Sequence, residues 1–529
     1  MKKLLSLLFV ATGFMFVSCD EDLTETFVPG QLTDQVAVTN SNELQRLLNS
    51  GYNILTNREA AVFTSVFTDE ATKGYNNGGQ GVNTEIVFNI FPASAAPTAI
   101  WQSNYFALAR INRVIDFSNR IVAVDAADQA LINRIKAEAL VLRAYAHLNI
   151  LAYFSPNTKD DTALAGILAN RIIGTDERPS RVTNAVFYTQ IHQDLDDALA
   201  IFAVDGASTS ERYARPVFAK GLKARAYAYK GDYLNAEIWA DDVITTSGIL
   251  LADRNQYINM FWRDTYAPNR ELIFVLHRTQ QQNTQGGNLH NGWCSVRPNV
   301  GGSPFYEVGR SLFNILNPGP TPVSPSLLFN NVNDVRAATI IAPSSVMSSD
   351  YQNSPDYLND DRLILHKHGG IISGTTGTNT WATTATNANN NGHKVMRLSE
   401  MYLIKAECRA AASDLIGTAT AIDAIRDARY GSDQALPVYA NVTAAWKGVL
   451  DERRLELAFE GHRYIDIKRL GVQAGISGLD RDPMDYNTDG LNIPGGDPAN
   501  LPLTSHKWAL PIPQSEINGN GGIQQNAGY

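Results

Sequence analysis

Hydrophobic residues recur at intervals of three and four along several long stretches of the chain, which is the pattern of amphipathic helices. Residues 134–154 carry it most clearly, as two apolar rows: Ile135, Ala139, Leu142 and Ala146, then Leu140, Ala144, Leu148 and Leu151. Two rows indicate contacts on two sides, and the alanines allow close approach of neighbouring helices. Further helices are predicted from about Ser41, from Trp101 and over 191–202, and a short strand over 85–91. The pattern therefore predicts a mainly α-helical protein.

Two segments are predicted to form helical hairpins, residues 216–246, which break at Gly231-Asp232, and residues 395–429. In the first, small and aromatic residues occupy the packing positions of a tetratricopeptide repeat: Ala224, Tyr227, Gly231, Tyr233, Ala236 and Ala240. Such hairpins cannot bury their apolar faces alone, so we expect them to stack with the helices around them.

The stretch from Leu450 to Gly471 combines a predicted helix with an unusual density of charge. Leu455, Ala458 and Phe459 form an apolar stripe at helical spacing. The surrounding side chains are mostly ionisable, so this helix is expected to be central to the fold.

Glu452, Glu456 and Glu460 lie on one face of that helix, where like charges repel by about 0.2–0.5 kcal/mol per pair. Pairs at i, i+3, Arg453 with Glu456 and Glu460 with Arg463, would relieve part of this repulsion, and arginines from elsewhere are expected to reach the face. The carboxylates are either an acid/base pair, as in glycosidases, or a structural ion-pair network. We favour the network, because carboxylates one turn apart point the same way and do not flank a substrate bond.

Residues 266–392 differ in character, being rich in Asn, Gly, Thr, Ser and Pro. A long irregular segment within a compact domain is usually functional or disordered. Trp293, Tyr306 and Trp381 stand among these polar residues. Sugar rings present apolar C–H faces that stack on Trp and Tyr, so these three are predicted to contact a glycan.

Composition narrows the function further. Hydrophobic residues at 44% and charged residues at 18% are typical of a globular protein, and a net charge of -9 argues against nucleic acid as a partner. The chain has no nucleophile elbow, zinc-protease, phosphate-loop or CxxC motif. Residues 485–490 match the first half of a calcium loop, but Gly496 replaces its final glutamate. We predict no enzyme activity, no cofactor and no metal site.

The N-terminus has the layout of a signal peptide, residues 1–18, in which two lysines precede an apolar run too short to span a bilayer comfortably. The run ends in Phe16-Val17-Ser18-Cys19, which resembles the site where bacterial lipoproteins are lipidated. Cys19 is therefore the predicted lipid attachment, the alternative being ordinary secretion. Residues 19–40 are predicted to form a tether, and Cys408 a small core residue.

Several motifs together resemble one family. ERRLELAFEGHRYIDIKRLG is similar to the C-terminal signature of SusD/RagB proteins, surface lipoproteins of Bacteroidota that help import nutrients. The helix at Trp101 resembles the family's W-x3-Y-x5-IN helix, and residues 134–156 its EA-x-x-LRA stretch. The last residues resemble the family ending LPIP-x-x-E-I, then QN-x-GY. The resemblance covers the chain from Cys19 to Tyr529.

The resemblance implies a SusD-like fold, with a tetratricopeptide-like scaffold of hairpins, long irregular loops and an irregular C-terminal tail. It divides the chain into an N-terminal helical region, residues 41–260, and a C-terminal RagB/SusD region, residues 261–529, that carries the loop-rich insert. It also adds Trp101 and Asn104 as glycan-binding candidates. Because Trp101 opens a helix, the alternative is that it serves only as a packing residue.

The implied function is capture of an oligosaccharide or polysaccharide at the outer membrane surface and delivery to a SusC-like TonB-dependent transporter. The protein is expected to be surface-exposed and lipid-anchored, and to act as a lid on that transporter. Peptide uptake, glycan hydrolysis and a scaffold that grips a peptide remain as alternatives.

Overall fold

The computed structural model describes residues 38–56, 58–74, 84–278, 289–293, 305–318, 333–343, 362–368, 372–373, 380–381, 391–485 and 500–529. The predicted signal peptide, Cys19 and most of the tether lie outside these residues, as do Cys294 and the calcium-like segment after Asp485. Within the described chain, no helix combines the length and apolar character needed to cross a membrane.

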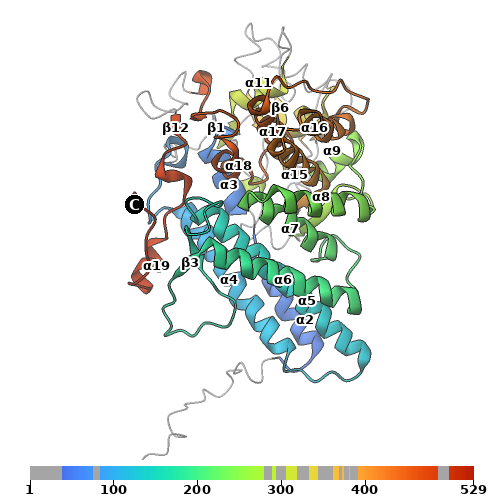
Figure 1. Cartoon of the computed structure of the whole chain (residues 1–529), viewed down its shortest axis with the longest axis vertical. Helices are drawn as coiled ribbons and strands as arrows, with labels where there is room; N and C mark the ends of the chain where they lie inside the picture. Colours follow the sequence, from blue (N-terminus) through green and yellow to red (C-terminus); the bar gives the residue numbers. More distant parts are fainter. Residues whose placement is uncertain are drawn as a thin grey trace, which may run out of the picture.

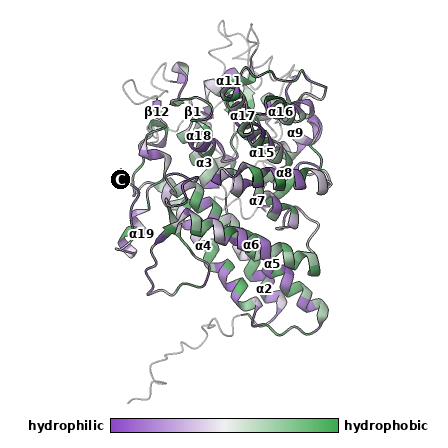
Figure 2. Ribbon diagram, in the orientation of Figure 1, coloured by the Kyte–Doolittle hydropathy of each residue, from purple (hydrophilic) through white to green (hydrophobic). Residues whose placement is uncertain are grey.

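A bundle of long helices forms the N-terminal half of the fold (Figure 1). Its members are α2 (Ser41–Ile54), α3 (Arg58–Phe67), α4 (Ala95–Ser118), α5 (Ala126–Phe154) and α6 (Asn184–Asp205). The α5 helix packs against α4 and α6, as its two apolar rows predicted, and hydrophobic positions run along all the bundle helices (Figure 2). His147 is fully buried in this core, where its Nε2 accepts from the Ala169 N–H (3.2 Å) and burial lowers its pKa to about 3.

Both predicted hairpins are confirmed, as α7 (Pro216–Lys230) with α8 (Tyr233–Thr246) and α15 (Leu398–Ala411) with α16 (Leu415–Tyr430). Gly231 ends α7 with a φ of +82°, a conformation that glycine adopts without a steric penalty. The hairpins stack through α8 and α15, so each covers the apolar face of the other. The α9 (Arg254–Trp262), α11 (Arg310–Leu316) and α13 (Val335–Ile340) helices lie around them.

Short strands are spread along the chain. An antiparallel sheet has the order β1 (Ala71–Lys73), β5 (Tyr306–Val308), β7 (Leu363–Leu365) and β6 (Ile341–Pro343). The antiparallel pairs are β4 (Leu272–Leu276) with β10 (His393–Arg397), β2 (Leu164–Ile167) with β3 (Arg181–Thr183), β8 (Ile372–Ser373) with β9 (Thr380–Trp381), and β11 (Gly478–Asp480) with β12 (Asn500–Pro502).

The described residues also include four single turns of 3-10 helix and the short helix α19 (Gln514–Gly519) near the C-terminus. The 3-10 turns are η2 (Thr84–Val87), η4 (His290–Gly292), η6 (Pro483–Asp485) and η7 (His506–Trp508). The predicted strand over 85–91 was wrong, because η2 occupies its first residues.

The charged stretch forms two helices rather than one, α17 (Val442–Leu457) and α18 (Arg463–Leu470). Phe459 and Gly461 adopt positive φ angles of +61° and +92° in the turn between them, which ends the predicted helix. The apolar stripe is nevertheless buried as expected, because Leu455, Ala458 and Phe459 belong to one hydrophobic cluster.

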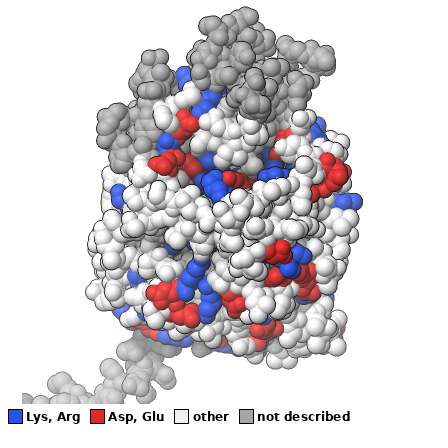
Figure 3. All heavy atoms as spheres, turned by 45° about the horizontal axis from the view of Figure 1, so that its top comes forward, with Lys and Arg blue, Asp and Glu red and all other residues white. Residues whose placement is uncertain are grey.

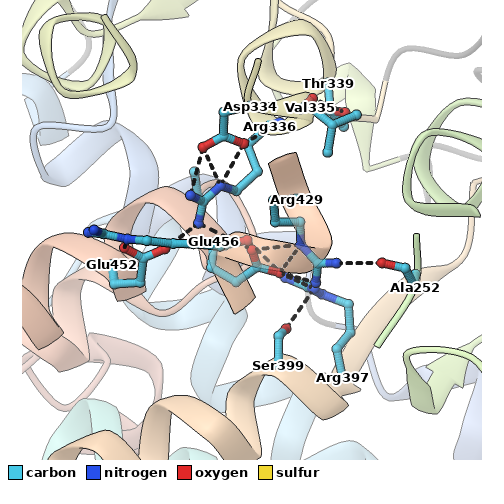
Figure 4. Close-up of polar contacts among 12 residues, drawn as sticks. Ala252, Asp334, Val335, Arg336, Thr339, Arg397, Ser399, Arg429, Glu452 and Glu456 are labelled. Carbon is cyan, nitrogen blue, oxygen red and sulfur yellow. Dashed lines mark hydrogen bonds and ion pairs between the residues drawn. The ribbon is translucent and has the colours of Figure 1, made fainter. Parts of the chain in front are cut away.

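Arginines from α13, α16 and the end of strand β10 reach the glutamate face, as the repulsion argument required (Figure 4). The Glu456 carboxylate accepts from Arg397 (2.7 Å) and Arg429 (2.8 Å), while Arg336 donates to Glu452 (2.6 Å). These side chains are buried, and the surrounding guanidinium groups hold the pKa of Glu456 well below its usual range despite the cost of burial. Glu460 is bound in turn by Arg397 (2.8 Å) and Lys367 (2.6 Å).

The predicted i, i+3 pairs do not form. Arg453 pairs with Asp466 (2.7 Å) and Glu407 (3.0 Å), and Arg463 pairs with Asp69 (2.9 Å). The break between α17 and α18 separates Arg463 from Glu460, whereas Arg453 lies on α17 itself and pairs with Glu407 and Asp466 in place of Glu456. Glu452, Glu456 and Glu460 are each paired with arginine or lysine side chains, so we assign the network a structural role.

Candidate ligand-binding site

The two candidates on α4 are buried side chains. Trp101 is 2% exposed, with its ring against Phe154 (4.8 Å between centroids) and Tyr105 (4.5 Å). Its indole N–H donates to Glu516 Oε2 (3.2 Å). Asn104 is 6% exposed and donates to the carbonyl of Ile100 (2.7 Å) within its own helix. Trp101 therefore supports its neighbours, in agreement with the packing alternative, and neither side chain presents a surface for stacking.

Trp293 is also fully buried, contrary to its expected place on an exposed loop platform. Its ring stacks on His368 (5.6 Å between centroids) and meets Phe459 edge-on (5.7 Å). The indole N–H donates to Ser65 Oγ (2.7 Å), which satisfies its polar group inside the core. The structure leaves no face of this ring open to a sugar.

The remaining two candidates lie on strands. Tyr306 is half-buried in β5, packed against the same hydrophobic cluster as Trp293. Trp381 belongs to β9, but its side chain lies outside the described part of the structure. Roles for Tyr306 and Trp381 in glycan binding stay predictions.

A pocket of about 430 Å³ is lined by Tyr105 and Glu516, two residues that contact Trp101, and no sequence motif predicted it. One wall is a face of α4, where Tyr105, Ala109, Asn112 and Arg113 follow one another at helical spacing. The second wall is the connection between β2 and β3, and the third is α19 with the residue after it. The volume is within the range of small-molecule sites, about 300–1,000 Å³.

Hydrogen bonds from α4 hold the β2–β3 connection in place. The Tyr105 hydroxyl donates to the Ile167 carbonyl (2.9 Å) and accepts from its N–H (2.8 Å). The Asn112 amide donates to the carbonyls of Ala169 (2.8 Å) and Arg171 (2.9 Å). Arg143 of α5, in a buried ion pair with Asp194 (2.6 Å), donates to the Asn112 oxygen (3.1 Å). The pocket wall is thus attached to the bundle by buried polar contacts.

The C-terminal segment closes the third wall. It runs along the side of the molecule and brings α19 beside the β2–β3 connection (Figure 1). Asn520 donates to the Pro179 carbonyl (2.8 Å), and Arg181 donates to Gln524 and Asn526 (3.0 Å each). Glu516 receives the Trp101 N–H described above, so Trp101 links α4 to α19. The family-like ending of the chain is therefore a structural part of this pocket.

Charges of both signs border the pocket. Arg171 and Glu177 form a bidentate ion pair, which, with the Gly174 N–H (2.7 Å), lowers the pKa of Glu177 to about 2. Arg113 and Arg178 add two positive charges, and Glu516 adds one negative charge. Mixed signs also characterise the face seen in Figure 3, where the coloured Lys/Arg and Asp/Glu side chains form small interspersed groups. A ligand with many neutral donors and acceptors suits such a lining better than one of a single charge.

Metal chemistry has no support in the described residues, where no three His, Cys, Asp or Glu side chains gather into a possible metal site. Asp485, at the start of the calcium-like motif, accepts from the Arg310 N–H (3.1 Å), and burial raises its pKa to about 6. Cys408 is buried, as predicted, and its thiol is free.

Two family models match the chain. The model described as the SusD family matches residues 343–529, and the one described as starch-binding associating with outer membrane matches residues 31–228. A search of the curated proteins gave no match.

Solved structures match over nearly the whole chain. A SusD superfamily protein from Bacteroides thetaiotaomicron is 23% identical, with a TM-score of 0.71 over 92% of this chain and 100% of that one. Surface glycan-binding protein A from Bacteroides fluxus is 20% identical, with a TM-score of 0.65 over 93% and 100%. A laminarin-binding SusD-like protein is 20% identical, with a TM-score of 0.64 over 93% and 100%. At these identities the likeness establishes the fold.

Proposed function

This chain belongs to the SusD/RagB family, and from that premise we propose that it captures a glycan at the outer membrane and delivers it to a SusC-like TonB-dependent transporter. The family assignment carries the proposal, because one matching model is described as starch-binding and associating with the outer membrane. The names of two solved relatives, a laminarin-binding protein and a surface glycan-binding protein, support a glycan as the ligand. Lipidation of Cys19 would hold the protein on the membrane.

The pocket beside α4 is our proposed glycan site. Tyr105 and the aliphatic Ile172 and Ile173 offer apolar surface to the C–H groups of a sugar ring. Arg178 and Glu516 supply a donor and an acceptor for hydroxyl groups. Loop residues attached to a rigid helical scaffold are where binding sites are usually found.

Isothermal titration with neutral oligosaccharides, including laminari- and malto-oligosaccharides, tests this site. Glu516→Gln keeps an acceptor for Trp101 while removing the charge, and Arg178→Ala removes an exposed donor. Each variant should weaken binding about fivefold or more, which corresponds to about 1 kcal/mol, without lowering the melting temperature. Asn518→Ala is the matched control, because this exposed residue shares α19 with Glu516 but does not line the pocket.

Two outcomes would count against this assignment. If both pocket variants bind as tightly as the parent protein, the glycan site lies elsewhere. If no member of a broad glycan panel binds the parent protein, glycan capture itself is wrong and peptide ligands become the next test.

A further inference from the structure

A second pocket, of about 360 Å³, has a different chemical character. It lies where the C-terminal end of α2, the segment before α7 and the end of β4 meet. Tyr52 and Tyr213 form an aromatic corner, with their rings 6.1 Å apart and nearly perpendicular. Arg212, His277 and Arg278 supply the basic groups of the lining, and no aspartate or glutamate is among the described residues that line it.

The two arginines are not neutralised by carboxylates within the described chain, where neither forms an ion pair. Arg278 is buried, and its guanidinium donates to the main-chain carbonyls of Leu55, His277 and Tyr52, which are neutral acceptors. Burial without a paired acid lowers its pKa to about 10, still far above neutrality. Arg212 is exposed at the pocket edge. His277 Nδ1 is buried and makes no hydrogen bond in the described structure.

Glu59, Glu138, Glu211 and Asp264 lie near this pocket but do not line it; Glu59 acts electrostatically on Arg278, and Asp264 acts on His277. Glu138 accepts from the Tyr52 hydroxyl (2.6 Å), and burial raises its pKa to about 7. Glu59 forms an ion pair with Arg58 (3.6 Å). The pocket therefore concentrates positive charge in a protein whose net charge is -9. Guanidinium groups in such a setting favour planar or tetrahedral oxyanions through paired, charge-assisted hydrogen bonds.

We propose that this pocket binds one anionic group of a glycan, the carboxylate of a sugar acid or the sulfate ester of a sulfated sugar. Arg212 and Arg278 hold the oxyanion, and the Tyr52–Tyr213 corner contacts the ring that carries it. That the ligand is a glycan rests on the proposed function. That it carries an anionic group is inferred from the basic lining of the pocket alone.

Titration calorimetry with matched probes tests whether the pocket requires a negative charge on its ligand. An oligogalacturonate is compared with its methyl ester, and a sulfated oligosaccharide with its desulfated form. At least one anionic probe should bind tenfold or more tightly than its uncharged counterpart. Its affinity should also fall severalfold between about 50 and 500 mM NaCl, because added salt shortens the Debye length. The probe that binds identifies the anion as carboxylate or sulfate.

Arg212→Gln locates the binding, because Arg212 is exposed and its replacement leaves the core intact. This variant should bind the anionic probe at least fivefold more weakly than the parent protein. Arg120→Gln is the matched control: it makes the same charge change at an exposed arginine of the α4–α5 turn, outside this pocket. The affinity of the control variant for the anionic probe should stay within twofold of that of the parent protein.

Equal affinity for charged and uncharged probes overturns the proposal, as does an equal effect of the two arginine variants. If neutral glycans bind the first pocket but acidic ones bind no better, only this inference fails. If an acidic probe binds through Arg212 while no neutral glycan binds, the anion site stands and the neutral-glycan site fails. If neither kind of glycan binds, both proposals fail.

Discussion

Replacement of Glu456 by alanine is the sharpest test of the buried charge network. The Glu456 carboxylate is 0% exposed and receives hydrogen bonds from Arg397 (2.7 Å) and Arg429 (2.8 Å), with Arg336 at 3.5 Å. Glu456→Ala removes the shared anion and leaves these guanidinium groups short of negative charge in the interior. Removing one partner of a buried ion pair typically costs about 3–5 kcal/mol.

That cost can be converted into a melting temperature. An unfolding entropy of about 2.1 cal/mol/K per residue gives about 1.1 kcal/mol/K for a chain of 529 residues. A loss of about 3–5 kcal/mol therefore lowers the melting temperature by about 3–5 °C. Differential scanning calorimetry can measure a change of this size.

Asp451→Ala is the control, because Asp451 lies on the same helix but pairs at the surface with Lys447 (2.6 Å). A surface pair contributes less than about 1 kcal/mol, so its melting temperature should change by less than about 1 °C. The reasoning is refuted if Glu456→Ala melts like the parent protein. A variant that keeps its stability but no longer binds glycan would instead give Glu456 a functional role.

Three further predictions follow from burial and from the N-terminus. Trp293→Ala should lose about 3–5 kcal/mol of stability, measured by denaturant unfolding, yet retain glycan binding when folded; lost binding at unchanged stability would restore its role as a platform. Glu138→Gln should change the pH dependence of stability. In the folded protein the Glu138 carboxyl group has a pKa of about 7, against 4.5 for the free group, so it keeps its proton to higher pH than in the unfolded chain. The parent protein therefore loses stability as the pH rises from about 4.5 to about 7, and the variant should not. Melts of both proteins from pH 4 to 8 would show no difference if the carboxyl ionises normally. Cys19→Ala should leave the protein soluble or unprocessed, and full partition of this variant with the outer membrane would exclude lipidation at that residue.

Helical periodicity predicted the scaffold well, because each long helix buries a continuous stripe. The two rows of α5 and the break at Gly231 are local signals, and both correspond to observed packing. The turn at Phe459 could not be predicted in this way. Its positive φ is adopted by a residue that normally avoids it, and packing of its ring against Trp293 holds it there.

The expected exposure of Trp293 was wrong for a related physical reason, because its side chain is fully buried. Polar neighbours in the sequence suggested an exposed loop, but η4 and β5 bring this ring against α3 and the turn after α17. Composition describes what surrounds a residue along the chain, whereas burial depends on segments hundreds of residues away. The Ser65 hydroxyl that satisfies the indole N–H is such a partner.

At the proposed glycan pocket beside α4, most residues of the family motifs hold the structure together, and a different segment is expected to select the ligand. Trp101, Asn526 and the arginine of β3, Arg181, are engaged in contacts that attach the C-terminal segment to the bundle. Glu516 belongs to the same family-like ending, yet it also borders the pocket. By contrast, Arg171, Glu177 and Arg178 lie on the exposed β2–β3 connection, where substitutions leave the core untouched. Because the motifs maintain the frame, ligand choice at this pocket should depend on that connection. Exchanging residues 171–178 with those of a relative that binds another glycan should therefore transfer preference without unfolding the protein.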